Sequence, residues 1–219
     1  MAIDHLKINQ LLQRLRSRPY RIYEVKTPHT GYLKEFLVKE ETEVKGPRGK
    51  WREIPGTPLF TLEREKNVKT IRARVSGTVH SLRAELEGRF VEAEEVVLEI
   101  RHPLSQEEVI SEFLRETLIL ITAPETARYL LAPEIETRIR KEGLGRVLVR
   151  PNEELLIMSF MKRETPIVHT GETMVIFRIF FTPQEVVPAG SPLLGLCFRE
   201  EVPYLERVIN RIREEWPEK

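Results

Sequence analysis

Two lysines follow strand-like segments at places where a short turn is expected, and a lysine amine is a nucleophile once it has lost its proton. Lys162 follows the apolar run 155–158 and precedes the strand-like segment 163–167. Lys66 follows a similar run at 59–62. A tight hairpin at either position would lift one lysine off a small β-domain, where a modifying enzyme can reach it. An exposed lysine stays largely protonated near neutral pH, so that enzyme must supply the base.

The elements that position these lysines are predicted from hydrophobic periodicity. Apolar residues at helical spacing over 4–16 and 205–216 predict helices at the two ends of the chain. Ser105 and Glu108 have the spacing of a capping box and open a helix between two strand-rich blocks. The predicted division is an N-terminal helix at 1–20, a first strand-rich domain at 21–102, a connecting helix at 103–117, a second strand-rich domain at 118–198 and a C-terminal helix at 199–219.

Short motifs recur within the strand-rich blocks. The Pro-His-Thr-Gly sequence at 28–31 returns as Val-His-Thr-Gly at 168–171, and Gly-Thr-Pro-Leu-Phe at 56–60 returns as Gly-Ser-Pro-Leu-Leu at 190–194. A unit this short exposes an apolar face, which it must bury against a partner. Two such units related by a pseudo-twofold axis would form a flattened barrel, and the chain holds enough units for two barrels.

The sequence around both lysines resembles the biotinyl/lipoyl attachment domain family, in two copies that cover roughly 21–101 and 118–198. In the first copy an apolar strand, an acidic residue, Lys66 and a strand ending in Val-Ser-Gly at 75–77 follow the order typical of the family. In the second copy the Met-Lys pair at 161–162 and the Glu-Thr-Pro-Ile sequence after it match closely.

The resemblance implies a mainly β fold with helical termini and a helical connector (α+β), built from two flattened β-barrels of the barrel-sandwich-hybrid type. It places Lys66 and Lys162 at the attachment position for biotin or, as the less favoured cofactor, lipoate. The flanking residues depart from the family pattern. Lys162 keeps Met161 but is followed by Arg163, where biotin carriers usually have methionine. Lys66 follows Glu65, as the lysine of lipoyl carriers usually follows an acidic residue.

The function implied is a biotin (or lipoyl) carrier subunit of a cytoplasmic carboxyl- or acyl-transfer complex, without catalytic activity of its own. Its partners would be a biotin or lipoate protein ligase and carboxylase or transferase subunits. The alternative is a structural or regulatory module that binds an unknown protein and has no prosthetic group. The loop insertion at 47–54, which includes Trp51, favours this alternative. A periplasmic adaptor ranks last, because the chain shows no signal segment, membrane anchor or long helical hairpin.

Composition argues against several other classes of function. Thirty-five basic and thirty-four acidic residues leave a net charge of +1, which gives no field to attract nucleic acid or an anionic membrane. Cys197 is the single cysteine, so no intrachain disulfide and no cysteine-based metal cluster can form. His29 and His169 lie in the recurring turn motif, where we expect them to bond the turn backbone. The sequence predicts no catalytic residue and no metal site.

Overall fold

The computed structural model describes residues 5–49, 52–161 and 163–216, and the chain divides into two compact units. The first unit is residues 14–104, and the second unit combines residues 1–13 with residues 105–219. The five-segment division predicted from the sequence stays a prediction.

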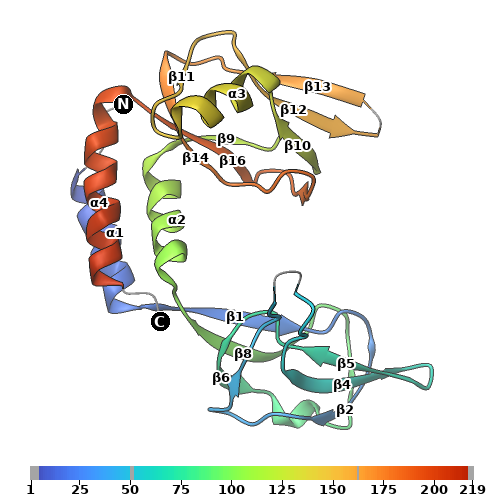
Figure 1. Ribbon diagram of the computed structural model, residues 1–219. Helices are drawn as coiled ribbons and strands as arrows, with labels where there is room; N and C mark the ends of the chain where they lie inside the picture. Colours follow the sequence, from blue (N-terminus) through green and yellow to red (C-terminus); the bar gives the residue numbers. More distant parts are fainter. Residues whose placement is uncertain (1–4, 50–51, 162, 217–219) are drawn as a thin grey trace. The chain divides into compact units, whose positions relative to one another are not determined.

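The first unit contains two four-stranded antiparallel sheets (Figure 1). One sheet has the order β1–β8–β6–β3 and consists of β1 (Tyr20–Lys26), β8 (Val96–Pro103), β6 (Gly77–Leu82) and β3 (Glu43–Val44). The other has the order β5–β4–β2–β7 and consists of β5 (Asn67–Arg72), β4 (Pro58–Arg64), β2 (Gly31–Phe36) and β7 (Phe90–Val91). A 3₁₀ turn, η1 (Ala84–Leu86), precedes β7.

Both sheets of the first unit contribute to one hydrophobic core. Leu33 on β2 lies opposite Leu62 on β4, and both side chains are fully buried because alternate residues of a strand share one face. The core also contains side chains from the other sheet: Val79, Val97, Leu98 and Ile100. Alternation is interrupted in β4, where the four consecutive residues from Leu59 to Leu62 are all buried, and in β8, where Val97 and Leu98 are both buried.

The second unit also contains two four-stranded antiparallel sheets. One has the order β11–β14–β16–β9 and consists of β11 (Leu148–Val149), β14 (Met174–Ile179), β16 (Pro192–Cys197) and β9 (Ile119–Thr122). The other has the order β13–β12–β10–β15 and consists of β13 (Arg163–Val168), β12 (Glu154–Phe160), β10 (Ala127–Leu131) and β15 (Val186–Val187). The order of β9 to β16 in these sheets repeats the order of β1 to β8 in the first unit.

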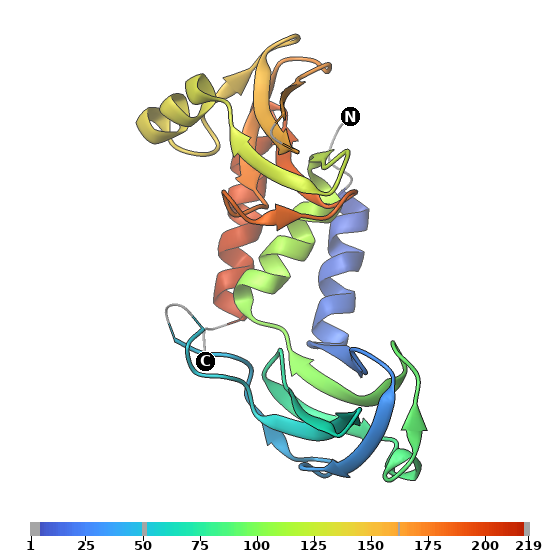
Figure 2. The ribbon, with the colours of Figure 1, turned by 90° about the vertical axis from the view of Figure 1, so that its right-hand side faces the viewer.

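Helices complete the second unit. They are α1 (His5–Ser17, of which residues up to 13 belong here), α2 (Gln106–Thr117), α3 (Pro133–Glu142), η2 (Arg199–Glu201) and α4 (Val202–Glu215). Figures 1 and 2 show α1, α2 and α4 side by side. Ser105 and Glu108 form the predicted capping box of α2. Asp4, the predicted N-cap of the first helix, lies outside the described residues.

The predicted fold of two flattened β-barrels is wrong. A barrel needs a hydrogen-bonded ladder that closes on itself. Instead, the described strands form four separate open sheets, and each ladder stops at an edge strand, such as β1 and β3 in one sheet and β5 and β7 in the other. Four of these edge strands (β3, β7, β11 and β15) have only two residues each, which is too short to extend the pairing. Alternation in the sequence identified which residues face a core, but it carries no information on which edges join.

Candidate modification site

Lys66 lies at the tip of the hairpin formed by β4 and β5. The last pair of the ladder joins Arg64 and Asn67, which leaves Glu65 and Lys66 as a two-residue loop. Both loop residues have positive φ, 52° for Glu65 and 66° for Lys66, as the tight turn that matches the twist of a hairpin requires. The hairpin turn that the sequence predicts at Lys66 is therefore confirmed.

The Lys66 side chain is exposed, and within the part of the chain that the structure describes no hydrogen bond or ion pair holds its ammonium group. The neighbouring ion pair of Arg64 and Glu65 spans 3.8 Å between exposed side chains, so it contributes little to stability. The base of the hairpin is firmly held, because Phe60 and Leu62 on β4 are fully buried. Lys66 therefore lies at the end of a hairpin whose base is packed in the core, and its amine is accessible to another protein. Covalent attachment of a prosthetic group would require this accessibility.

The β12–β13 hairpin occupies the same place in the strand order of the second unit. Its last ladder pair joins Phe160 and Arg163. Met161, the residue after Phe160, has φ of 47° and its side chain is 81% exposed. Lys162 lies outside the described residues, so its predicted role as an attachment site stays a prediction.

The two histidines of the recurring motif differ in their surroundings. His29 follows β1 in the first unit, and its Nδ1 lies 3.0 Å from the carbonyl oxygen of Thr30. His169 follows β13 in the second unit and is buried, and its Nε2 lies 2.6 Å from the carbonyl oxygen of Glu172. A carbonyl can only accept, so Nε2 of His169 carries the proton. Both histidines thus bond turn backbone, as expected from the sequence.

No group of three or more His, Cys, Asp or Glu side chains among the described residues is arranged to hold a metal ion. Cys197 is buried at the end of β16. Burial, and to a smaller extent the nearby carboxylates of Glu201 and Glu200, raise the pKa of its thiol to about 12. Its thiolate is therefore scarce at neutral pH, and Cys197 is a poor nucleophile.

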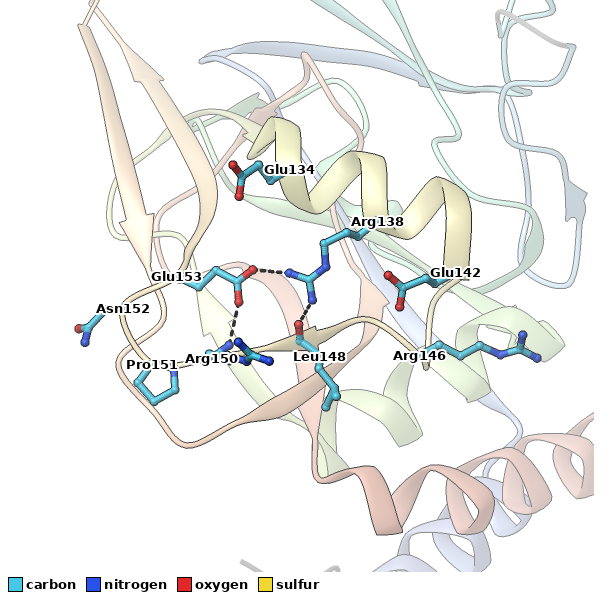
Figure 3. Close-up of a pocket in the computed structure, with 9 residues that line it drawn as sticks. All are labelled: Glu134, Arg138, Glu142, Arg146, Leu148, Arg150, Pro151, Asn152 and Glu153. Carbon is cyan, nitrogen blue, oxygen red and sulfur yellow. Dashed lines mark hydrogen bonds and ion pairs between the residues drawn. The ribbon is translucent and has the colours of Figure 1, made fainter.

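A surface depression of about 550 Å³ in the second unit was missed by the sequence analysis (Figure 3). Arg138 of α3 bonds Glu153 and the carbonyl oxygen of Leu148, while the other oxygen of Glu153 accepts a 2.8 Å bond from the backbone nitrogen of Arg150. Arg138 thus joins α3 to the turn before β12. One feature of the sequence pointed to this role of Arg138. It lies three residues after Ile135, so the two share the face of α3 that turns to the core, where Ile135 is buried.

Arginine and glutamate side chains both line this depression, and their formal charges cancel. The acidic ones are Glu134, Glu142 and Glu153, and the basic ones are Arg138, Arg146 and Arg150. Since Arg138 and Glu153 bond each other, the arrangement stabilises the fold of the second unit and gives no net charge to select a ligand.

No protein-family model matches the chain, and no curated protein matches it either. Among solved structures, the chain is similar to a single-chain, multi-domain long-chain acyl-CoA carboxylase, with 14% sequence identity and a TM-score of 0.30. The match covers 87% of this chain and 22% of that chain, so this chain spans about a fifth of the carboxylase's length. Similarity at this level establishes neither a shared fold nor a shared function.

Within the described residues no helix has both the length and the apolar character needed to cross a membrane.

Proposed function

We propose that this protein is a carrier subunit that presents a covalently attached biotin or lipoyl group on Lys66, and on Lys162 in the second unit, to the enzymes of a carboxyl- or acyl-transfer complex. The observation that carries the proposal is the position of Lys66: an unpaired, exposed amine at the tip of a two-residue hairpin loop. The resemblance of the surrounding sequence to attachment domains supports the same function.

Attachment requires an enzyme that brings an activated acyl group. Nζ of the neutral lysine attacks the carbonyl carbon of an acyl-adenylate, the C–N amide bond forms, the C–O bond to phosphate breaks, and AMP leaves. The proton lost from Nζ goes to a base of that enzyme, since no carboxylate among the described residues is bonded to Lys66.

Once attached, biotin would carry a carboxyl group and lipoate an acyl group. This chain contributes to the transfer reaction by positioning the attached group. The buried strand β4 fixes the base of the hairpin, and the exposed loop lets the long lysine arm reach outward. Tethering raises the effective concentration of the carried group at a partner's active site.

The alternative function is a binding module that has no prosthetic group. The inserted segment between β3 and β4 favours it, because Arg48 and Ile54 of this segment pair as an isolated β-bridge and the side chain of Ile54 is exposed. Trp51, expected to mark this loop, lies outside the described residues.

Labelling of the recombinant chain separates the two functions. The protein is incubated with ATP and either biotin or lipoate in an extract of its native cells, and its intact mass is measured. We expect a mass increase of one amide-linked group for each lysine that is used. Lys66→Arg should remove one group, and Lys162→Arg should remove a second group where both lysines are used. Lys69→Arg is the matched control, because Lys69 is an exposed lysine on the same hairpin. An unchanged mass with both cofactors would favour the binding module.

A further inference from the structure

The outward face of the sheet β5–β4–β2–β7 carries a row of four side chains close to Lys66. The register places Val68 opposite Glu63, Glu63 opposite Tyr32, and Tyr32 opposite Phe90. Residues that lie opposite one another on neighbouring strands project from the same face, so these four residues form a continuous line across the sheet. We call this line the aromatic row.

The three uncharged members of the aromatic row are unusually exposed. Val68 is 55%, Tyr32 54% and Phe90 52% exposed. The rings of Tyr32 and Phe90 contact each other edge to face, with centroids 5.4 Å apart and planes at 75°. Exposed aromatic side chains that contact one another are typical of protein-binding surfaces, where tyrosine and other large rings supply much of the binding energy.

The charged member of the row is already neutralised. Glu63 accepts an ion-paired hydrogen bond from Lys34, with 2.8 Å between Nζ and the carboxylate oxygen, and this bond raises the pKa of Lys34. A partner can therefore cover the row with an apolar surface and leave no lone carboxylate without a counterion.

The geometry of the hairpin directs an approaching enzyme to this face. Lys66 lies two residues from Val68, which corresponds to about 7 Å along a strand. A stable protein contact buries about 800 Å² on each partner, more than a two-residue loop offers, so an enzyme that holds Lys66 must also contact an adjoining face. The inward face is closed, because Leu33, Phe60 and Leu62 are fully buried in the core of the first unit.

We propose that the aromatic row is the docking surface for the ligase that transfers an acyl group from its adenylate to Lys66. This inference rests on the proposed function and adds the surface by which the modifying enzyme recognises the chain. Tyr32 and Phe90 supply the contact, and the Lys34–Glu63 pair keeps the row electrically neutral.

The test compares the kinetics of modification in the full chain carrying Lys162→Arg, so that Lys66 is the attachment site that is measured. The variant Tyr32→Thr/Phe90→Thr removes both rings and puts threonine, a β-branched residue that favours strands, into β2 and β7. The control is Tyr20→Thr/Ile22→Thr, which removes one exposed ring and one exposed aliphatic side chain from β1 in the other sheet. With the native ligase activity, ATP and the cofactor, we expect kcat/KM for the row variant to fall roughly ten- to a hundredfold, chiefly through KM, and the control to change less than about threefold.

A competition experiment reads binding without chemistry. The Lys66→Arg/Lys162→Arg chain cannot be modified at either lysine but keeps the aromatic row, so we expect it to inhibit modification of the wild-type chain at Lys66. The same chain with Tyr32→Thr and Phe90→Thr added should not inhibit. Circular dichroism and thermal unfolding of each variant confirm that the first unit remains folded.

The outcomes separate the two proposals. Modification of the wild-type chain with equal kcat/KM in the row variant and in the control overturns the docking surface alone. A wild-type chain that accepts neither biotin nor lipoate overturns the carrier function, and the docking surface with it. If light scattering shows a wild-type dimer that the row variant converts to a monomer while kcat/KM is unchanged, the row joins two copies of this chain, and the ligase surface is again overturned.

Discussion

Glu65 and Lys66 are consecutive residues that both adopt the left-handed backbone conformation, with φ of 52° and 66°, at the tip of the β4–β5 hairpin. Each residue other than glycine in this conformation costs roughly 1–2 kcal/mol. Asparagine followed by glycine is the favoured pair for such a loop. This loop therefore holds Lys66 in a conformation that glycine adopts at less cost.

The first prediction concerns the stability of this loop. Glu65→Asn/Lys66→Gly should raise the free energy of unfolding by about 1 kcal/mol, because asparagine and glycine adopt positive φ at less cost. Urea denaturation followed by circular dichroism measures the change. Lys69→Gly, placed in β5, should instead lower the free energy of unfolding by about 0.5–1 kcal/mol. Destabilisation by the loop variant would show that Glu65 and Lys66 are held by contacts that compensate for their backbone conformation.

The second prediction concerns the bond between Arg138 and Glu153 (Figure 3). Arg138→Met should lower the free energy of unfolding by about 2 kcal/mol, because it removes a charge-assisted bond to Glu153 and a bond to the carbonyl oxygen of Leu148. A double-mutant cycle with Glu153→Gln should give a coupling energy of about 1 kcal/mol or more. Arg146→Met, an exposed arginine of the same depression, is the control and should change stability by less than about 0.5 kcal/mol. If the changes in unfolding free energy caused by Arg138→Met and Glu153→Gln are additive, the two side chains do not stabilise each other.

The third prediction concerns the end of α4. Nε2 of Gln106, the first residue of α2, donates to the carbonyl oxygens of Arg213 and Trp216 at 3.1 Å and 2.7 Å. The last carbonyls of a helix have no partner within that helix. Gln106→Leu should therefore lower the free energy of unfolding by about 1–2 kcal/mol. It should also shift the fluorescence emission of Trp216 towards that of free indole in water. Gln13→Leu, on an exposed position of α1, should leave both measurements nearly unchanged. Equal behaviour of the two variants would show that Gln106 has no role in holding α4.

The fourth prediction follows from the raised pKa of Cys197, about 12 in the folded protein against a reference value of 9.0. The folded state holds the thiol proton that the unfolded state releases. The stabilising contribution is therefore full below pH 9 and is lost as pH rises towards 12. Between pH 8 and pH 10.5 the wild-type chain should lose about 2 kcal/mol more stability than Cys197→Ala. Parallel pH profiles for the two proteins would contradict this, as would rapid reaction of the folded thiol with a disulfide reagent at pH 8.

The hairpin of Lys66 and the capping box of α2 could be predicted because both depend on residues a few positions apart. The turn needs two residues between Arg64 and Asn67, and the cap needs Ser105 three residues before Glu108. The arrangement of the sheets depends on pairing between distant strands, which alternation does not encode, and the predicted barrels were wrong for that reason. The aromatic row could not be predicted for the same reason, since Tyr32 and Phe90 are brought together by the register of β2 and β7. Arg138 was missed because its partner Glu153 lies fifteen residues away, across β11.

The most direct test of the carrier function is the intact mass of the protein purified from its native cells, followed by mapping of the modified peptide. We predict a mass increase that corresponds to amide-linked biotin or lipoate and that maps to Lys66, with Lys162 as the second position. An unmodified mass, in cells whose other carrier proteins are modified, would contradict it and would leave the binding module as the function of this chain.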